Sequence, residues 1–357
     1  MIKTTYYQDL TKMNTFGMKV KARCFVEYDS VADLVDIEFE ELARPVLHIG
    51  GGSNLLFTDD FKGTVLHSKI SFIEILNEDA PAGTPVLVSV GAGVVFDDFC
   101  AWAAKEGLWG VENLSHIPGE VGASAVQNIG AYGVEVKDVI HSVCCYDTEE
   151  EEFVKFDVSE CGYGYRDSVF KDPEVKGRFI VTHVVFSLTR TPAPRLDYGH
   201  LKEAVLSASV RDIEEEMAAR LTPMLIRKEI IKIRKEKLPE PSVMGSAGSF
   251  FKNPVISAEH FARIEAAAKS EHGADFKVPH YDLPDGTVKV PAAWMIEQCG
   301  WKGRRSGGAA VWDKQPLVIV NYTGEAYPEE IIGLEKRIIA SVKAKFSVEL
   351  HPEVEHV

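Results

Sequence analysis

The segment HIGGGSNLLF, residues 48–57, restricts the possible folds more than any other part of the sequence. It joins one short apolar strand to a second strand. The usual dinucleotide-binding fold instead needs G-x-G-x-x-G at the start of a helix and an acidic residue about 20 positions later. The consecutive glycines Gly50, Gly51 and Gly52 free the backbone to turn its N–H groups toward an anion. They suit a tight strand-to-strand turn equally well, so the loop alone leaves both interpretations open.

A second glycine-rich segment, IPGEVGASAVQNIGAYG at 117–133, is too apolar for an ordinary surface turn. Val121, Val126 and Ile129 would be left in water if the segment were only a solvated loop. Backbone donors suit phosphates, amide side chains suit the edges of a ring, and aliphatic side chains suit its face. The segment therefore favours a site for a large flat heterocycle that carries phosphate groups.

Charge and composition exclude several classes of partner. The 39 basic and 54 acidic residues give a net charge of −15, which disfavours nucleic acid and anionic membrane as partners because both reward a basic surface. No run approaches the ~20 apolar residues of a membrane span, and the first twenty residues do not resemble a signal peptide. The six cysteines show neither CxxC nor a metal-ligand spacing. We therefore expect a cytoplasmic protein without a metal site.

Mixed signals for helices and strands predict an α+β protein. A helix is expected at 30–43 with Asp29 or Ser30 as its N-cap, and another at 96–107 that ends on a glycine. Thr222 and Pro223 are a suitable N-cap and first residue for a helix up to 236. The sequence KLPEP then breaks the chain before a separate α/β region, 240–346.

Five motifs occur in the order found in one enzyme family: IGGGSN, IPGEVGASAVQNIGAYG, GYRDSVFK, AGSFFKNP and the terminal PEV. The chain thereby resembles the UDP-N-acetylenolpyruvoylglucosamine reductases from residue 14 to Glu353. The resemblance implies a FAD-binding fold of the vanillyl-alcohol oxidase type, made of two α/β subdomains, and a C-terminal α/β substrate domain. The implied boundaries are 1–71 with 347–357, 72–236, and 240–346. The segment RLDYGHL (195–201) is similar to the extra segment of one subtype, which carries a tyrosine that covers the substrate.

The resemblance implies non-covalent FAD as the cofactor and NADPH as the co-substrate. The implied reaction reduces the enol ether of UDP-N-acetylglucosamine enolpyruvate to UDP-N-acetylmuramate for peptidoglycan. The sugar nucleotide and NADPH are then the expected partners, and we expect a monomer.

Three residues match the catalytic residues of the family. Arg166 would hold the substrate carboxylate, because a guanidinium stays charged and binds a carboxylate with two donors. Ser249 would deliver a proton to the carbanionic carbon after hydride addition. Glu353 would donate a hydrogen bond to the developing enolate if burial raises its pKa. Without the resemblance, a salt bridge with Asp167, a turn serine and a solvated acid would be the simpler interpretations.

The remaining site residues are assigned on the same basis. The glycine loops and their neighbours would bind the cofactor, and a mixed set of aromatic, basic and amide residues would bind the substrate. The cofactor set is Gly50, Gly51, Gly52, Ser53, Asn54, Ile117, Pro118, Gly119, Gly122, Ala123, Ser124, Gln127, Asn128 and Ile129. The substrate set is Tyr132, Tyr165, Tyr198, Arg234, Lys237 and Asn253.

Two positions depart from the pattern common in the family. Ser246 stands where many members carry asparagine, and His351 replaces an acid in the terminal motif. Two other functions remain open: a sugar or alcohol oxidase of the same superfamily, and a nucleotide-binding protein that has lost catalysis. Many such oxidases attach flavin to a histidine in the glycine loop, whereas Asn54 follows GGGS here. Retention of Arg166, Ser249 and Glu353 counts against loss of catalysis.

Overall fold

The chain forms two compact units in a computed structural model that describes residues 1–211 and 221–357. Unit 1 comprises Met1–Asp9, Lys21–Gly52 and Asp60–Lys235. Unit 2 comprises Leu10–Val20, Ser53–Asp59 and Glu236–Val357. The expected α+β class is confirmed. The three-part division of the chain stays a prediction.

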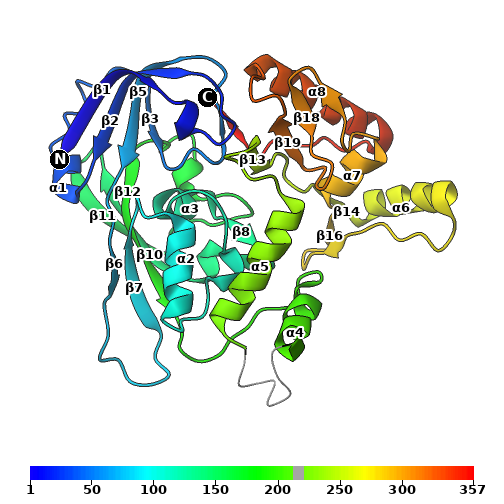
Figure 1. Ribbon diagram of the computed structural model, residues 1–357, viewed down its shortest axis with the longest axis horizontal. Coiled ribbons are helices and arrows are strands. Elements are labelled where there is room, and N and C mark those ends of the chain that lie inside the picture. The colour runs from blue at the N-terminus through cyan, green and yellow to red at the C-terminus, as the bar shows by residue number, and fades with distance from the viewer. Residues whose placement is uncertain (212–220) are drawn as a thin grey trace. The chain divides into compact units, whose positions relative to one another are not determined.

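Unit 1 contains a four-stranded sheet in the order β1-β2-β5-β3, drawn in blue in Figure 1. Its strands are β1 (Ile2–Asp9), β2 (Lys21–Tyr28), β3 (Val46–Ile49) and β5 (Phe61–Ser68). β1 runs antiparallel to β2, whereas β5 runs parallel to both β2 and β3. The β3–β5 register places Ile49 beside His67. The glycine loop that follows β3 therefore begins next to the end of β5.

The helix after β2 is much shorter than expected. Ser30 is its N-cap, as expected, and its Oγ accepts a hydrogen bond from the N–H of Asp33 at 3.1 Å. However, α1 spans only Val31–Val35, so the prediction of a helix over 30–43 is wrong beyond its first turns. Ile37, Phe39 and Leu42 pack against a buried cluster. This packing overrides the helical propensity of the segment.

The second sheet of unit 1 is antiparallel, in the order β11-β10-β12-β7-β6. The helices α2 (Phe96–Lys105) and α3 (Val121–Gln127) contribute buried side chains to its core. Phe99 of α2 and Phe186 of β12 lie with their ring centroids 4.5 Å apart in this core. Two short strands, β8 (Gly130–Ala131) and β9 (Val134–Glu135), form a hairpin. The sheet strands are β6 (Ile73–Ile75), β7 (Val86–Gly91), β10 (Ile140–Asp147), β11 (Glu152–Asp157) and β12 (Phe179–Leu188).

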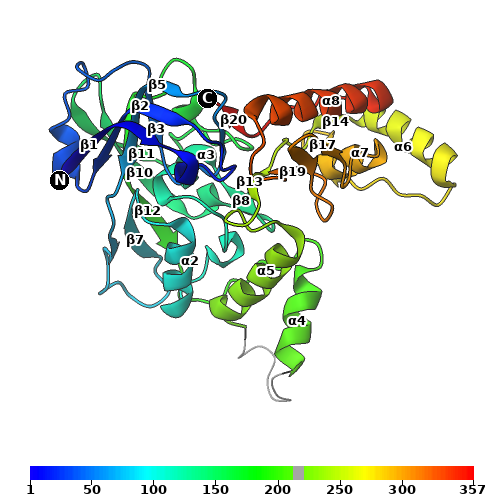
Figure 2. The same cartoon turned by 45° about the horizontal axis from the view of Figure 1, so that its top comes forward.

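Two further helices lie side by side in Figure 2: α4 (Leu201–Arg211) and α5 (Pro223–Lys237). Leu201 and Val205 of α4 share a buried cluster with Ile226 and Ile230 of α5. The expected start of α5 is confirmed, because the Oγ1 of Thr222 accepts a hydrogen bond from the N–H of Leu225 at 3.1 Å. The shared apolar face stabilises the α4–α5 pair.

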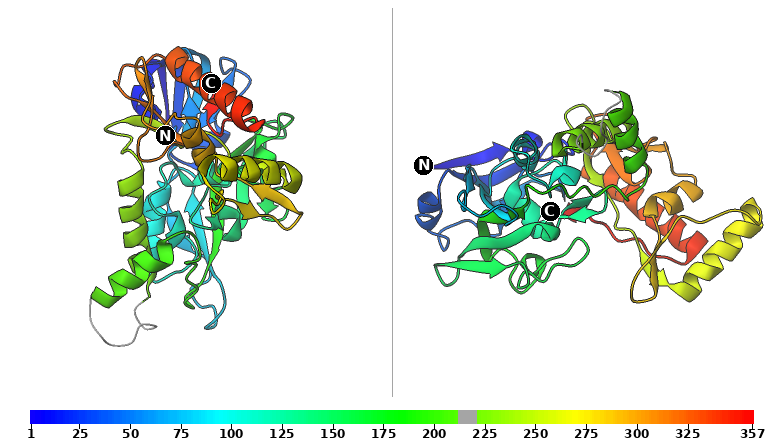
Figure 3. Two further views of the ribbon diagram at one scale, coloured as in Figure 1. Left: turned by 90° about the vertical axis from the view of Figure 1, so that its right-hand side faces the viewer. Right: turned by 90° about the horizontal axis from the view of Figure 1, so that it is seen from below.

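Unit 2 is built around a four-stranded sheet in the order β13-β19-β18-β17. The strands of this sheet are β13 (Gly245–Ser249), β17 (Arg305–Ser306), β18 (Ala309–Val311) and β19 (Val318–Asn321). The other strands are β4 (Leu55–Leu56) parallel to β20 (Glu355–His356), and a small sheet of β14 (Val255–Ser257), β16 (Thr287–Lys289) and β15 (Tyr281–Asp282). Its helices, in yellow to red in Figure 3, are α6 (Ala258–His272), α7 (Ala292–Gln298) and α8 (Pro328–Phe346).

Among the helices of residues 1–211 and 221–357, none is both long enough and apolar enough to span a bilayer.

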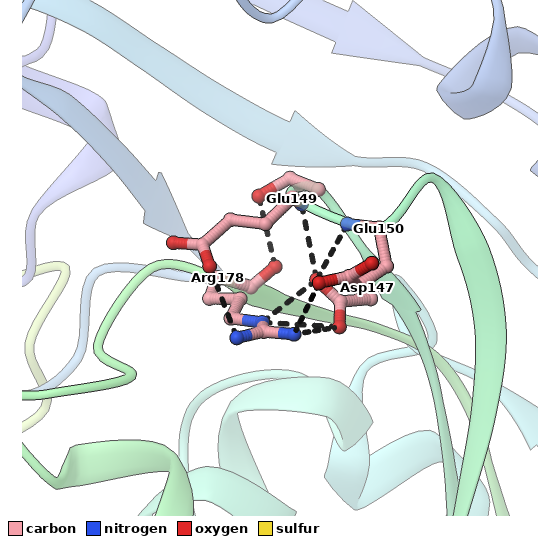
Figure 4. A network of polar contacts seen from close by, with 5 residues as sticks. Asp147, Glu149, Glu150 and Arg178 are labelled. Carbon is pink, nitrogen blue, oxygen red and sulfur yellow. Dashed lines mark hydrogen bonds and ion pairs between the residues drawn. The ribbon is translucent and has the colours of Figure 1, made fainter.

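Arg178 and three acidic residues form a network of polar contacts next to the end of β10, which Figure 4 shows from close by. Arg178 donates from Nε to Asp147 Oδ1 at 2.9 Å and from Nη2 to Asp147 Oδ2 at 2.7 Å. It also forms an ion pair with Glu149, whose Oε2 lies 3.0 Å from its Nη1. The Asp147 carboxylate is buried, and the N–H of Glu149 also donates to it. The network therefore joins the end of β10 to the residue before β12.

We expect Asp147→Asn to lower the thermal unfolding midpoint at neutral pH by about 2–4 °C. Hydrogen bonds from Arg178 hold the pKa of Asp147 below its usual value. Its stabilising charge is therefore present above the unfolded-state pKa and is lost as the pH falls through the lower folded-state pKa. The difference between the variant and the wild type should vanish in strong acid. Glu150→Gln is the control, because Glu150 is exposed and 3.8 Å from Arg178. An unchanged midpoint in Asp147→Asn would contradict the role of the network.

Candidate active site

Two glycine loops of unit 1 approach each other through bare backbone. A Cβ atom on Gly51 would lie 3.3 Å from the Cα of Gly119, and one on Gly50 would lie 3.0 Å from the Cβ of Ala123. Within the described ranges, the N–H groups of Gly50 and Gly51 donate to no acceptor. Backbone donors that no side chain shields, in a space that a Cβ would fill, fit the diphosphate of a bound dinucleotide. The predicted cofactor residues of unit 1 are thus brought together in part.

The rest of the 117–133 segment is fixed by its own contacts. A Cβ on Gly122 would meet the Cβ of Ala92 at 2.9 Å, so only glycine permits the close approach of α3 to the turn after β7. Ser124 Oγ donates to the carbonyl of Val121 at 2.7 Å. Gln127 Oε1 accepts a hydrogen bond from Lys171 Nζ at 3.0 Å. Ile117 and Ile129 pack against the core of the five-stranded sheet.

Asn128 connects this segment to the arginine loop. It ends α3 in the left-handed conformation, with φ of 43°, and it is completely buried. Its side-chain Nδ2 donates to the carbonyl of Gly164 at 2.7 Å, and its Oδ1 accepts from the N–H of Lys137 at 3.2 Å. The Asn128 amide therefore holds two backbone segments together.

Arg166 is held by backbone carbonyls at the end of the same segment. Its guanidinium donates to the carbonyl of Gly130 at 2.8 Å and to the carbonyl of Asn128 at 3.2 Å. The guanidinium carbon lies 5.8 Å from the ring centroid of Tyr165. Arg166 itself has φ of 56°, in a tight turn where Gly164 and Asp167 exchange backbone hydrogen bonds. Such backbone strain in a residue that is not glycine is common at functional sites.

Arg234 and Tyr132 form a second polar centre in unit 1. Arg234 Nε donates to the carbonyl of His116 at 3.1 Å. Burial lowers the pKa of Arg234 while the nearby Tyr132 opposes this effect, and burial raises the pKa of Tyr132. The rings of Tyr132 and Tyr198 meet edge to face with centroids 6.0 Å apart. Two predicted substrate residues, Tyr132 and Arg234, thus lie together, with Tyr198 beside them.

Unit 2 places Ser249 and Glu353 on adjacent segments. The N–H of Glu353 donates to the carbonyl of Phe250 at 2.8 Å, and Phe251 forms a bridge with Pro352. Phe250 and Phe251 are almost completely buried, with ring centroids 5.1 Å apart, whereas Ser249 remains half-buried. The aromatic pair therefore anchors the end of β13, which carries the serine. The expected bend at this serine is instead an irregularity within the strand: the β13–β19 register shifts between Ser246 and Ser249, and Gly248 there has φ of 68°.

The remaining predicted residues of unit 2 have structural contacts of their own. Asn54 Nδ2 donates to the carbonyl of Glu353 at 3.0 Å, which ties the end of the GGGSN loop to the terminal motif. Asn253 Oδ1 accepts from the N–H of Ala292 at 2.9 Å, at the start of α7. The carbonyl of Lys237 accepts a hydrogen bond from the indole of Trp312 at 3.0 Å. The binding roles assigned to these residues stay predictions.

Sequence reasoning missed two groups beside the glycine loops, Glu120 and His67. Glu120 Oε1 lies 2.9 Å from His67 Nε2, and its other oxygen would lie 3.3 Å from a Cβ on Gly50. An acid inside the glycine-rich GEVG sequence was a visible signal. Its histidine partner lies 53 residues earlier in the chain, and only the fold reveals the pair.

Comparisons with known proteins identify relatives of this chain. Residues 240–357 match the family model described as UDP-N-acetylenolpyruvoylglucosamine reductase, C-terminal domain, and residues 22–156 match a FAD binding domain. A UDP-N-acetylenolpyruvoylglucosamine reductase of Bacteroides fragilis (strain YCH46) is 49% identical over 349 residues, which cover 98% of each chain. One of Porphyromonas gingivalis (strain ATCC 33277) is 44% identical over 353 residues, or 98% of this chain and 97% of the relative.

A solved structure extends the comparison to the fold. The crystal structure of a UDP-N-acetylenolpyruvylglucosamine reductase from Thermus caldophilus aligns with all of this chain and 98% of its own, with a TM-score of 0.64 and 22% identity. The expected fold class, a FAD-binding fold with an additional C-terminal domain, is thereby confirmed.

Proposed function

The chain belongs to the UDP-N-acetylenolpyruvoylglucosamine reductase family, and on this premise we propose that Arg166, Ser249 and Glu353 are its catalytic residues. The protein is an oxidoreductase that reduces UDP-N-acetylglucosamine enolpyruvate to UDP-N-acetylmuramate for peptidoglycan synthesis. FAD, when bound, supplies hydride that it has received from NADPH. The residues of the chain bind and orient the substrate and control the charge and the proton.

Ser249 is the proposed proton donor. When the methylene carbon of the enolpyruvyl group has accepted hydride, negative charge develops on the adjacent carbon and spreads into the carboxylate. A serine is a weak acid in water, but it serves when it is held within reach of a strongly basic carbon. The buried Phe250 and Phe251 that follow it anchor the end of β13, where the serine lies.

Arg166 and Glu353 are proposed to stabilise the developing enolate. The Arg166 guanidinium keeps its charge and donates to carboxylate oxygens. Its existing bonds to the carbonyls of Gly130 and Asn128 fix its direction before the substrate binds. Glu353, in its protonated form, would donate a hydrogen bond to an enolate oxygen.

The single observation that supports this assignment best is the pairing of the Ser249 and Glu353 segments. The 2.8 Å bond from Glu353 N–H to the Phe250 carbonyl brings together two motifs that lie about one hundred residues apart in the sequence. This backbone pairing places the two segments side by side, as a joint role of Ser249 and Glu353 requires.

Further proposals concern binding and cellular location. We propose that the cofactor and substrate sets named above bind FAD and the sugar nucleotide, with Arg234 and Lys237 directed at phosphate groups. We also propose a monomer and a cytoplasmic location. All six cysteines lie in the described ranges and none forms a disulfide there, which is consistent with a reducing compartment.

An anaerobic two-step titration tests the proposed function. The purified protein should be yellow, NADPH should bleach the flavin spectrum, and UDP-N-acetylglucosamine enolpyruvate should then restore it. Acid denaturation should release intact flavin. If oxygen rapidly restores the flavin spectrum and the enolpyruvyl substrate does not, the protein is a flavin oxidase instead. A colourless protein that binds no FAD would refute the proposal.

A further inference from the structure

A buried histidine lies between two carboxylates at the base of the glycine loops. His67, in β5, has Nδ1 3.3 Å from Glu27 Oε1 and Nε2 2.9 Å from Glu120 Oε1. The exposed fraction of the His67 side chain is 6%, and that of Glu120 is 12%. The imidazole therefore lies within a largely desolvated cluster of charged groups.

Glu120 is poorly placed for a site that receives an anion. It follows Gly119 directly, and its Oε2 would lie 3.3 Å from a Cβ on Gly50. A bare carboxylate at this position, shielded from solvent, would repel a diphosphate held by the N–H groups of Gly50 and Gly51. The site fits the cofactor only if a positive charge compensates Glu120.

The groups around His67 favour its charged form. Burial lowers the pKa of His67, but the hydrogen bonds and charges of Glu120 and Glu27 outweigh this effect and raise it overall. His48, on the neighbouring β3, stays neutral because burial lowers its pKa to about 4, and its Nε2 lies 2.7 Å from the Tyr28 hydroxyl. Lys3 of β1 forms an ion pair with the far oxygen of Glu27 at 3.7 Å.

We propose that His67 is a positioning residue for the flavin site, whose imidazolium neutralises Glu120 so that a diphosphate can bind against Gly50, Gly51 and Gly119. This inference rests on the proposed function, because it assumes that FAD binds at the glycine loops. Glu27, in β2, lies against the other nitrogen of the imidazole, 3.3 Å from Nδ1. The charge on Glu120, rather than the packing of His67, is what must be balanced.

Titration of flavin-free protein with FAD tests the proposal, with quenching of flavin fluorescence as the readout. At about pH 7, His67→Gln should weaken FAD binding about tenfold, because it leaves Glu120 charged and uncompensated. Glu120→Gln should bind FAD within about threefold of the wild type. The double variant His67→Gln/Glu120→Gln should recover most of the loss, because neither charge remains.

Glu27→Gln is the matched control. It removes the other carboxylate from the same imidazole and leaves the glycine loops untouched, so FAD affinity at about pH 6 should stay that of the wild type. Urea unfolding of each flavin-free variant reports separately whether the fold is intact. A merely structural role for His67 would make the double variant as weak as His67→Gln.

The pH dependence supplies a second readout. The charge on His67 is complete below its ordinary pKa of about 6.5 and is lost as the pH rises through the raised pKa. FAD affinity of the wild type should therefore fall on the alkaline side, and this fall should be absent from the double variant. Equal affinity of His67→Gln and the wild type at about pH 7, or a weak Glu120→Gln variant, would overturn the inference. Failure of the wild type to bind FAD at all would instead refute the proposed function.

Discussion

Replacement of Ser249 by alanine should leave the reduction of the flavin by NADPH almost unchanged and slow its reoxidation by the enolpyruvyl substrate by about 10²–10⁴-fold. Only the second half-reaction needs a proton at the carbon next to the carboxylate. Stopped-flow absorbance under anaerobic conditions measures the two half-reactions separately, and the quotient of the wild-type and variant rates gives the lost transition-state stabilisation.

The structure gives reasons to expect a local effect. The side chains that anchor the end of β13, Phe250 and Phe251, are buried and unaffected by the substitution. Backbone hydrogen bonds also hold Phe250 directly after the serine: its N–H donates to the carbonyl of Leu317, and its carbonyl accepts from Glu353 N–H, each at 2.8 Å. Loss of one hydroxyl from a half-buried serine should therefore leave the fold intact.

Ser246→Ala is the matched control, because Ser246 lies on the same strand, β13, and is itself buried. It should leave both half-reactions close to the wild-type rates. Ser249→Cys should retain part of the second half-reaction, since a thiol can also donate a proton. Equal losses in both half-reactions of Ser249→Ala would refute the role of this serine as proton donor.

Local signals in the sequence predicted many of the elements. Gly107 follows α2 with φ of 69°, close to the predicted glycine stop, and Thr222 caps the start of α5 as predicted. These features depend on neighbours within a few residues, which is why periodicity and capping rules are sufficient for them.

Periodicity and capping rules do not predict contacts between distant segments. The extent of α1 was mispredicted because Ile37 and Leu42 pack in turns against strands that follow later in the chain. The bond from Asn128 to the carbonyl of Gly164, which helps to position Arg166, joins segments 36 residues apart. The motif resemblance identifies Arg166, Ser249 and Glu353 as candidate catalytic residues. It does not explain physically how the fold positions them.

The role of the glycine loops depends on contacts between segments that are distant in the sequence. From the sequence, the run Gly50–Gly52 suited an anion site and a tight turn equally well. Two facts of the fold favour the anion site: a Cβ on Gly51 would lie only 3.3 Å from the Cα of Gly119, and the N–H groups of Gly50 and Gly51 donate to no acceptor within the described ranges. Neither fact has a local sequence signature, because the second loop lies almost seventy residues away.

Replacement of Gly51 by valine should abolish flavin binding for practical purposes. A Cβ at this position would already lie 3.3 Å from the Cα of Gly119 and 3.8 Å from its nitrogen, so the larger side chain must displace one loop or fill the space between them. Loss of two hydrogen bonds to a charged diphosphate costs about 3 kcal/mol or more, which corresponds to a FAD affinity at least about 100-fold weaker.

The flavin content of purified Gly51→Val and fluorescence titration of its flavin-free form measure this effect, and thermal unfolding of the flavin-free form checks the fold. Gly51→Ala should show an intermediate loss, because a methyl group needs only a small shift of the Gly119 backbone. Gly333→Val is the control: a Cβ on Gly333 in α8 would meet nothing within 4 Å, so its FAD affinity should equal that of the wild type. If folded Gly51→Val binds FAD within about threefold of the wild type, the diphosphate does not lie between these loops.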